Sequence, residues 1–149
     1  MRLSTKGRYG LRAMIDIAQS QEEGPVAIHN IAQRQDLSNR YLEQLLIPLK
    51  QAGLVKSIRG SQGGYVLGRA AGSITVGDVI RVLEGPIAPV DCVNEMNPDD
   101  CDRADYCVTK KIWSRLRDSI VEVLDSYTLE DLMNEASAMG SQPIPIDKI

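Results

Sequence analysis

The segment from residue 38 to residue 67 constrains the fold most strongly. Ser38 is a favoured helix N-cap residue, and four leucines behind it recur at helical spacing. They are Leu42, Leu45, Leu46 and Leu49. Two short β-prone runs, 54–58 and 65–67, then flank a glycine-rich turn, which predicts a hairpin. A helix with one apolar stripe and a polar outer face, followed directly by a hairpin, is typical of a winged helix-turn-helix.

The segment before residue 38 is predicted to be helical. Apolar residues at helical spacing predict a helix over 6–20, which Thr5 can cap. Residues 26–28 could form a short strand or lead into a second helix that ends at the turn around Asp36. Pro48 removes one hydrogen bond of the leucine-rich helix and predicts that this helix is kinked or shortened.

Three more helices are expected after the hairpin, so the predicted fold is mainly α with a small β-hairpin wing. Thr75 and Asp78 form a capping pair for a short helix, and Thr128 can cap the last one. The predicted divisions are a winged helix-turn-helix over 1–84, a linker with a cysteine loop over 85–107, a dimerisation helix and a C-terminal helix over 108–139, and a flexible tail over 140–149.

The long helix expected over 108–126 carries a regular apolar seam. Residues spaced 3, 4, 3 and 4 apart form it, which is coiled-coil spacing. They are Trp113, Leu116, Ile120, Val123 and Tyr127. Such a helix can pack on its own domain, but this seam is longer than a small domain needs, and we expect a two-fold homodimer. A dimer would place two recognition helices one or more turns of DNA apart, which predicts a palindromic operator.

The charge distribution favours a polyanion as the partner of the first half. Residues 1–70 carry ten Lys/Arg and five Asp/Glu, a net of +5, whereas residues 71–149 carry seven and fifteen, a net of −8. In the leucine-rich helix, Gln44 can pair with adenine, Arg40 with guanine or phosphate, and Glu43 with a cytosine amino group. The alternative is a solvated face on a fold that serves protein contacts. The residues expected at DNA are Arg2, Lys6, Ser38, Arg40, Tyr41, Glu43, Gln44, Arg59 and Gly60.

All three cysteines lie in one polar, acidic stretch, 92–107, which has no apolar periodicity and is expected to be a surface loop. The spacing of Cys92, Cys101 and Cys107 is not that of a zinc finger. Three thiolates can hold an iron–sulfur cluster with a different fourth ligand, can bind zinc, or can act as redox-sensing thiols. His29, the single histidine, is expected to be a surface or capping residue rather than a ligand.

Several classes of protein are not favoured. No apolar run approaches the ~18 residues that cross a membrane, and the N-terminus lacks the pattern of a signal peptide, so a cytoplasmic protein is expected. With one histidine, no Cys-x2-Cys and no paired acid and base, the chain is not expected to be an enzyme. The alternatives from other classes are a small redox protein and a zinc-stabilised interaction module.

Several motifs together resemble those of the Rrf2 family, the winged-helix regulators that include IscR, NsrR and CymR. The matching segments span residues 1 to about 135, and the wing motif RGxxGGYxL, here RGSQGGYVL, is the most specific. The others are MRLSTKGRYGL, SNRYLEQLL, ITVGDVIRVLEGP and DSYTLEDL. The resemblance implies a dimer formed through the long helix and a protein that binds operator DNA, mostly as a repressor.

Two branches of that family imply different signals. In the IscR and NsrR branch the three cysteines would bind an iron–sulfur cluster, [2Fe–2S] in preference to [4Fe–4S], and Glu43 would discriminate between operators. The positions of the fourth ligand in that branch correspond to Lys110 and Arg8, so this ligand stays open. In the CymR branch the cysteines are absent and a partner enzyme of sulfur metabolism takes part. We predict a cluster-binding repressor, with a CymR-like repressor as the alternative.

Overall fold

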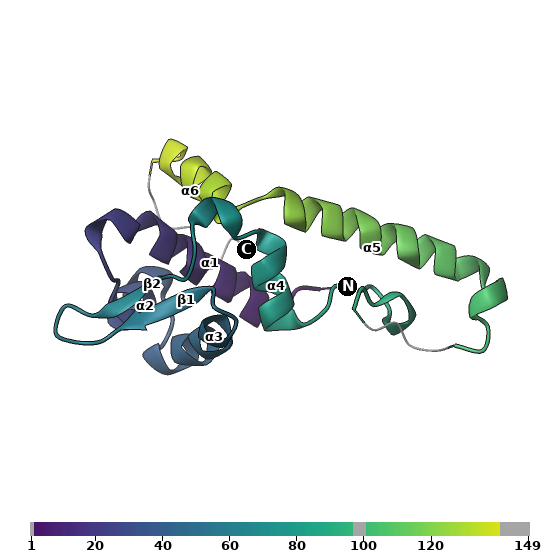
Figure 1. Ribbon diagram of the computed structural model, residues 1–149, viewed down its shortest axis with the longest axis horizontal. Coiled ribbons are helices and arrows are strands. Elements are labelled where there is room, and N and C mark those ends of the chain that lie inside the picture. The colour runs from purple at the N-terminus through teal and green to yellow at the C-terminus, as the bar shows by residue number, and fades with distance from the viewer. Residues whose placement is uncertain (1, 97–100, 141–149) are drawn as a thin grey trace.

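The computed structural model describes residues 2–96 and 101–140. It contains six α-helices and a two-stranded antiparallel hairpin in this described part (Figure 1), which confirms the predicted mainly α fold with a β wing. The elements are α1 (Thr5–Gln19), α2 (Ile28–Gln35), α3 (Asn39–Gln51), β1 (Val55–Ile58), β2 (Gly64–Leu67), α4 (Val76–Glu84), α5 (Val108–Ser126) and α6 (Leu129–Ala138). No helix in the described ranges is long and apolar enough to cross a membrane.

The apolar stripes of α1 and α3 meet in one core. Met14 and Ile17 of α1 are fully buried, and the leucines predicted to face inward on α3 are at most 1% exposed. Burying one such side chain stabilises the fold by roughly 1.5–3 kcal/mol. Pro48 lies inside α3, which continues to Gln51, so the proline does not shorten the helix as one alternative predicted.

The start of α1 differs from the prediction. Ser4 is the N-cap residue and Thr5 is already helical, but the Ser4 side chain makes no capping bond. The carboxylate of Glu84, at the end of α4, accepts hydrogen bonds from the backbone amides of Ser4 at 2.9 Å and Gly7 at 3.0 Å. A carboxylate from a distant helix therefore satisfies amides that a local cap would otherwise satisfy.

The hairpin is held to the body by a short extra bridge. Val55 pairs with Leu67 and Ile58 with Gly64, and Val26 exchanges two backbone hydrogen bonds with Tyr65. Residues 26–28 therefore do both things that were considered: Val26 extends the sheet, and Ile28 begins α2.

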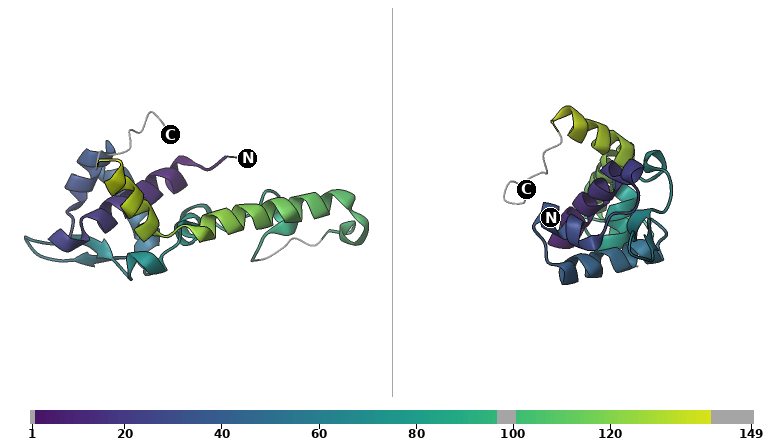
Figure 2. Two further views of the ribbon diagram at one scale, coloured as in Figure 1. Left: turned by 90° about the horizontal axis from the view of Figure 1, so that it is seen from above. Right: turned by 90° about the vertical axis from the view of Figure 1, so that its left-hand side faces the viewer.

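The last helix returns to the body instead of following the long helix outward (Figures 1 and 2). α6 packs on α1, and Leu129 at its first turn is fully buried in the core. Thr75 forms the capping box with Asp78 that the sequence predicts. Thr128 forms an equivalent capping box with Asp131. Gly140 follows α6 with φ +90, and the predicted flexible tail beyond it lies outside the described residues.

Helix α5 projects away from this body, and the described parts of the connector, 85–96 and 101–107, run beside it (Figures 1 and 2). The C-terminal end of α5, which we call its base, contacts α4. The short 3₁₀ turn Asp91–Val93 also packs against α5. None of its 19 residues is buried. A helix of this composition normally buries its apolar stripe, so α5 presents a surface that this single chain does not cover.

Candidate nucleic-acid interface

The outer face of α3 is a continuous polar surface. Arg40, Glu43 and Gln44 are all exposed, on the side of the helix opposite the buried leucines. Within the described part of the chain their side chains form no hydrogen bond or ion pair. Three side chains with the donors and acceptors that read base edges are therefore available on the face that a major groove can accommodate.

The N-terminal end of α3 is fixed both locally and to α1. The Ser38 hydroxyl accepts a hydrogen bond from the Tyr41 amide at 3.1 Å, as expected of an N-cap residue. The Tyr41 hydroxyl donates to Thr5 Oγ1 at 3.2 Å, and its ring meets that of Tyr9 edge-on at 6.2 Å. Ser38 therefore caps α3, and Tyr41 holds its first turn against the start of α1.

Basic residues lie at the edges of this surface. Arg2 and Lys6 are exposed at the start of α1, which Tyr41 joins to α3. Arg59 and Gly60 are exposed just after β1, at the tip of the wing. Gly60 has φ +110, a conformation that strongly favours glycine, and its carbonyl accepts from the Gly63 amide at 3.0 Å to close the turn. The turn therefore holds Arg59 at the tip of the wing, and Gly60, the residue with the positive φ, has no side chain to strain it.

The three cysteines are free thiols on the connector. Cys92 and Cys107 are half-buried and Cys101 is exposed. Cys107 is the N-cap residue of α5, where a hydrogen bond from the Thr109 hydroxyl and bonds to the backbone of Lys110 and Thr109 lower the pKa of its thiol. His29 is exposed on α2, as expected.

A cluster needs converging ligands as well as suitable atoms. Thiols are the right donors in kind, but no group of three His, Cys, Asp or Glu residues is placed to hold a metal ion in the described chain, which omits 97–100. Lys110, at one expected position of the fourth ligand, is an ammonium, which is a donor without a lone pair. The described residues therefore do not form a cluster site.

One arginine joins three segments of the chain near the C-terminal end of α5. Arg81 of α4 binds Glu95 of the connector through Nε at 2.7 Å and Nη2 at 3.1 Å. It also binds Asp125, near the end of α5, through Nη1 at 2.8 Å and Nη2 at 2.9 Å. Hydrogen bonds from Arg81 lower the pKa of both carboxyl groups, and the two carboxylates raise the pKa of Arg81. We call these three residues the Arg81 clamp.

Neither the Arg81 clamp nor a second ion pair, between α1 and α2, was predicted from the sequence. Asp16 of α1 is 4% exposed and binds Arg34 of α2 at 2.6 Å. A signal for this pair exists, because Asp16 lies between the half-buried Ile15 and the buried Ile17 in an otherwise apolar stretch, and a buried carboxylate needs a partner. No comparable signal marks Arg81, whose partners are 14 and 44 residues away.

Comparison with known proteins gives a consistent family. The Rrf2 model, described as an iron-dependent transcriptional regulator, matches residues 3–135. The HTH-type transcriptional regulator CymR of Bacillus subtilis is 54% identical over 132 residues, 89% of either chain. A structure of CymR, described as the global cysteine regulator of B. subtilis, aligns with TM-score 0.75 and 52% identity over 91% of this chain and 98% of that one. The T. potens IscR structure aligns with TM-score 0.77 and 48% identity over 94% and 91%.

The Arg81 clamp predicts a component of acid sensitivity. Because the pKa values of Glu95 and Asp125 are lowered, their ionised carboxylates stabilise the folded chain at pH values above the ordinary pKa values of 4.5 and 3.8. This contribution is lost as the pH falls through the lowered pKa values. We expect Arg81→Met to reduce the free energy of unfolding at neutral pH and to flatten its decline in that acidic range. Urea denaturation across pH measures both effects. The exposed Arg115 supplies the control Arg115→Met, and equal profiles for the two variants would contradict the prediction.

Proposed function

Because the chain belongs to the Rrf2 family of transcriptional regulators, we propose that it is a homodimeric repressor that binds a palindromic operator and controls genes of sulfur metabolism. The observation that carries the DNA-binding part is the exposed polar face of α3 with the wing beside it. The assignment to sulfur metabolism follows the B. subtilis relative, whose structure is described as that of the global cysteine regulator. In this proposal a partner enzyme of sulfur metabolism supplies the signal.

Docking follows from the placement of the charged and polar residues. α3 enters the major groove, where Gln44, Glu43 and Arg40 reach base edges. Arg59 at the wing tip contacts a phosphate or the adjacent minor groove, while Arg2 and Lys6 contact the backbone beside α3. Ser38 and Tyr41 contribute by fixing the start of α3, and their hydroxyl groups stand near the same end of the helix.

The dimer follows from the uncovered face of α5. Leu116, Val123 and Tyr127 of the expected seam are 38%, 58% and 43% exposed, and Ile112 beside them is 57% exposed. Trp113 and Ile120 are half-buried against their own chain. A second copy of α5 covers an apolar face that water otherwise contacts, and one two-fold axis then relates two copies of α3.

A second candidate function is an iron–sulfur sensor that represses through the same dimer. The three free thiols on one connector favour it, and so does the 48% identity to T. potens IscR. The cluster would be held by Cys92, Cys101 and Cys107, of the [2Fe–2S] type, with a fourth ligand still to be found. The described arrangement of the connector does not gather these ligands, so the first candidate is preferred.

Base reading and phosphate contact have different signatures. Once an operator has been selected from random DNA, Gln44→Ala should cost about 1–3 kcal/mol and relax preference at a single base pair. Arg59→Ala should weaken binding to all sequences and reduce the salt slope by about one. Fluorescence anisotropy over a salt series measures both, with the exposed Gln51→Ala at the far end of α3 as control. Equal losses for Gln44→Ala on operator and random DNA would remove Gln44 from base reading.

Association can be tested at the most exposed member of the seam. Val123→Asp places a charge on the apolar face, where it would be desolvated in a dimer, so we expect a monomer with weakened operator binding. Sedimentation equilibrium gives the mass, and circular dichroism checks the fold. Glu122→Gln, at the adjacent exposed position, alters charge off the seam and should remain dimeric. A dimer of unchanged mass in Val123→Asp would refute this interface.

Anaerobic purification separates the two candidate functions. The preferred candidate predicts a colourless protein without stoichiometric iron and sulfide, and a triple Cys→Ala variant at positions 92, 101 and 107 that binds the operator like the wild type. Absorption spectroscopy, iron and sulfide assays and anisotropy measure these properties. Stoichiometric iron and sulfide lost in the triple variant would reject the cluster-free candidate in favour of the sensor.

A further inference from the structure

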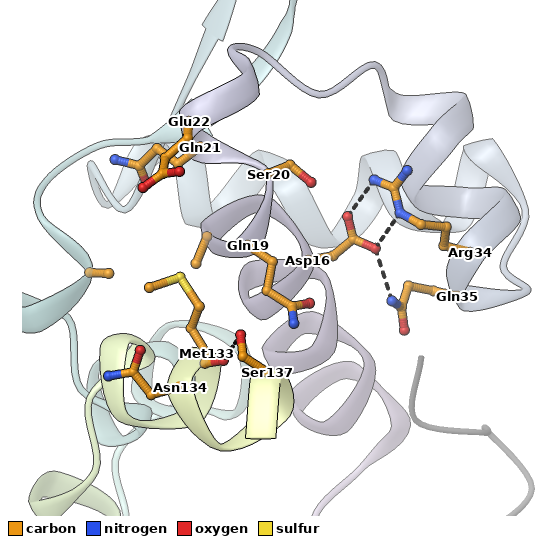
Figure 3. Close-up of a pocket in the computed structure, with 12 residues that line it drawn as sticks. Asp16, Gln19, Ser20, Gln21, Glu22, Arg34, Gln35, Met133, Asn134 and Ser137 are labelled. Carbon is orange, nitrogen blue, oxygen red and sulfur yellow. Dashed lines mark hydrogen bonds and ion pairs between the residues drawn. The ribbon is translucent and has the colours of Figure 1, made fainter. Parts of the chain in front are cut away.

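Two hollows on the described surface differ in how their charges are paired. The larger lies between α1, α2 and α6, where Asp16 already accepts hydrogen bonds from Arg34 and Gln35 (Figure 3). The smaller, of about 340 Å³, lies on the exposed face of α5, and we call it the α5 hollow. Its lining residues are Lys111, Ile112, Arg115, Leu116 and Ser119. Two cations and no carboxylate line it, so its charges are left to pair with a partner.

The α5 hollow has the spacing that receives a side chain from another helix. Four of its residues stand at i, i+3, i+4 and i+7, which are the positions that form a hole in knobs-into-holes packing. They are Ile112, Arg115, Leu116 and Ser119. Ile112 is 57% exposed and Leu116 38% exposed, so the apolar part of the hollow is uncovered in the single chain. An apolar side chain with an anion beside it would therefore complement the α5 hollow.

Most other charged residues of α5 are already bound within the chain. Arg117 donates to Asp118 at 2.8 Å, and Asp125 belongs to the Arg81 clamp. Three exposed charges have no hydrogen bond or ion pair in the described part of the chain, and they are Lys111, Arg115 and Glu122. Glu122 follows Arg115 by seven residues, two turns along the same edge of the helix. This edge therefore reads positive and then negative from its start to its end.

A second copy of α5 that runs in the opposite direction matches both the shape and the charges. A two-fold axis perpendicular to the helix, between residues 117 and 118, places Val123 of the second copy opposite Ile112 and so in the α5 hollow. The same edges of the two helices then meet with their directions reversed. Glu122 of the second copy comes to the height of residue 113, between Lys111 and Arg115. The axis repeats these contacts, so both hollows are filled at once.

A parallel pair of helices lacks this match. A two-fold axis along the helices sets the charged edge of one α5 against the opposite edge of the other, which carries Trp113 and Ile120. Arg115 of the two copies would also stand at the same height, and Glu122 would face no cation. The charge pattern of α5 is therefore complementary to itself only when one helix is reversed.

We propose that the α5 hollow binds Val123 and Glu122 of a second copy of this chain, in an antiparallel pair of α5 helices. Val123 of the second copy fills the apolar part, and its Glu122 pairs with Arg115 and Lys111. The bodies that carry α3 then lie at opposite ends of the helix pair. This inference rests on the homodimer of the proposed function and adds its orientation and the residues that fix it.

Charge reversal in the full chain tests the pairing. Arg115→Glu and Glu122→Arg each bring like charges together at two symmetric places, so each should raise the dissociation constant of the dimer about tenfold at low salt. The double variant restores opposite charges and should associate like the wild type. Sedimentation equilibrium measures all three. Lys56→Glu reverses an exposed charge on the wing and should leave the dissociation constant unchanged.

Disulfide trapping measures the orientation separately. In a variant with alanine in place of the cysteines at 92, 101 and 107, Ile112→Cys together with Val123→Cys should give a covalent dimer on oxidation with glutathione disulfide. Val123→Cys alone should not, because the two copies of residue 123 would be about 16 Å apart along an antiparallel pair, too far for a disulfide. A parallel pair would instead cross-link through Val123→Cys alone.

The outcomes separate this inference from the proposed function. A monomeric wild type would reject the proposed homodimer, and the pairing with it. A dimeric wild type would overturn the pairing alone if the reversed charges left association unchanged, if the double variant failed to restore it, or if Val123→Cys cross-linked by itself.

Discussion

The arrangement of this chain depends on a guanidinium that two distant carboxylates share. Arg81 lies on α4, Glu95 on the connector and Asp125 near the end of α5, and four hydrogen bonds of 2.7–3.1 Å join them. Isolated surface ion pairs contribute little, but paired bonds from a planar guanidinium fix orientation as well as distance. Glu95 also accepts from the Ile87 amide at 3.1 Å, so the same carboxylate joins the start of the connector to Arg81.

The base of α5 is joined to the body by backbone as well as by charge. The Val76 amide donates to the Tyr127 carbonyl at 2.9 Å, and the Leu129 amide donates to the Ile74 carbonyl at 2.9 Å. These bonds bind the start of α4 to the junction between α5 and α6. The base of α5 is therefore fixed to the body that carries the polar surface of α3, although the two are far apart along the chain.

Local sequence signals predicted the fold well, because each acts over a few residues. Ser38 and Thr75 cap the helices expected of them, and Gly60 closes the turn of the wing. Contacts between distant residues were not predictable in this way. Glu84 accepts hydrogen bonds from the start of α1, and Arg81 joins three segments. The partners of both residues lie far away in the sequence, and no sequence pattern predicts these contacts. The cysteines show the same limit, since their spacing gives the donor atoms but not whether they converge.

The projection of α5 has a mechanical consequence. A helix of 19 residues is about 28 Å long at 1.5 Å per residue. Among the described residues, its bonds to the body lie near its C-terminal end, at Asp125 and Tyr127, whereas Arg117 in its middle donates to the Val93 carbonyl of the connector. It therefore acts as a lever: a tilt of about 10° at the junction would displace its far end by about 5 Å. In a dimer built on this helix, that displacement would change the separation of the two α3 helices by a similar amount. In such a dimer, a modest adjustment at the junction would therefore change how closely the separation of the two α3 helices matches the spacing of successive major grooves.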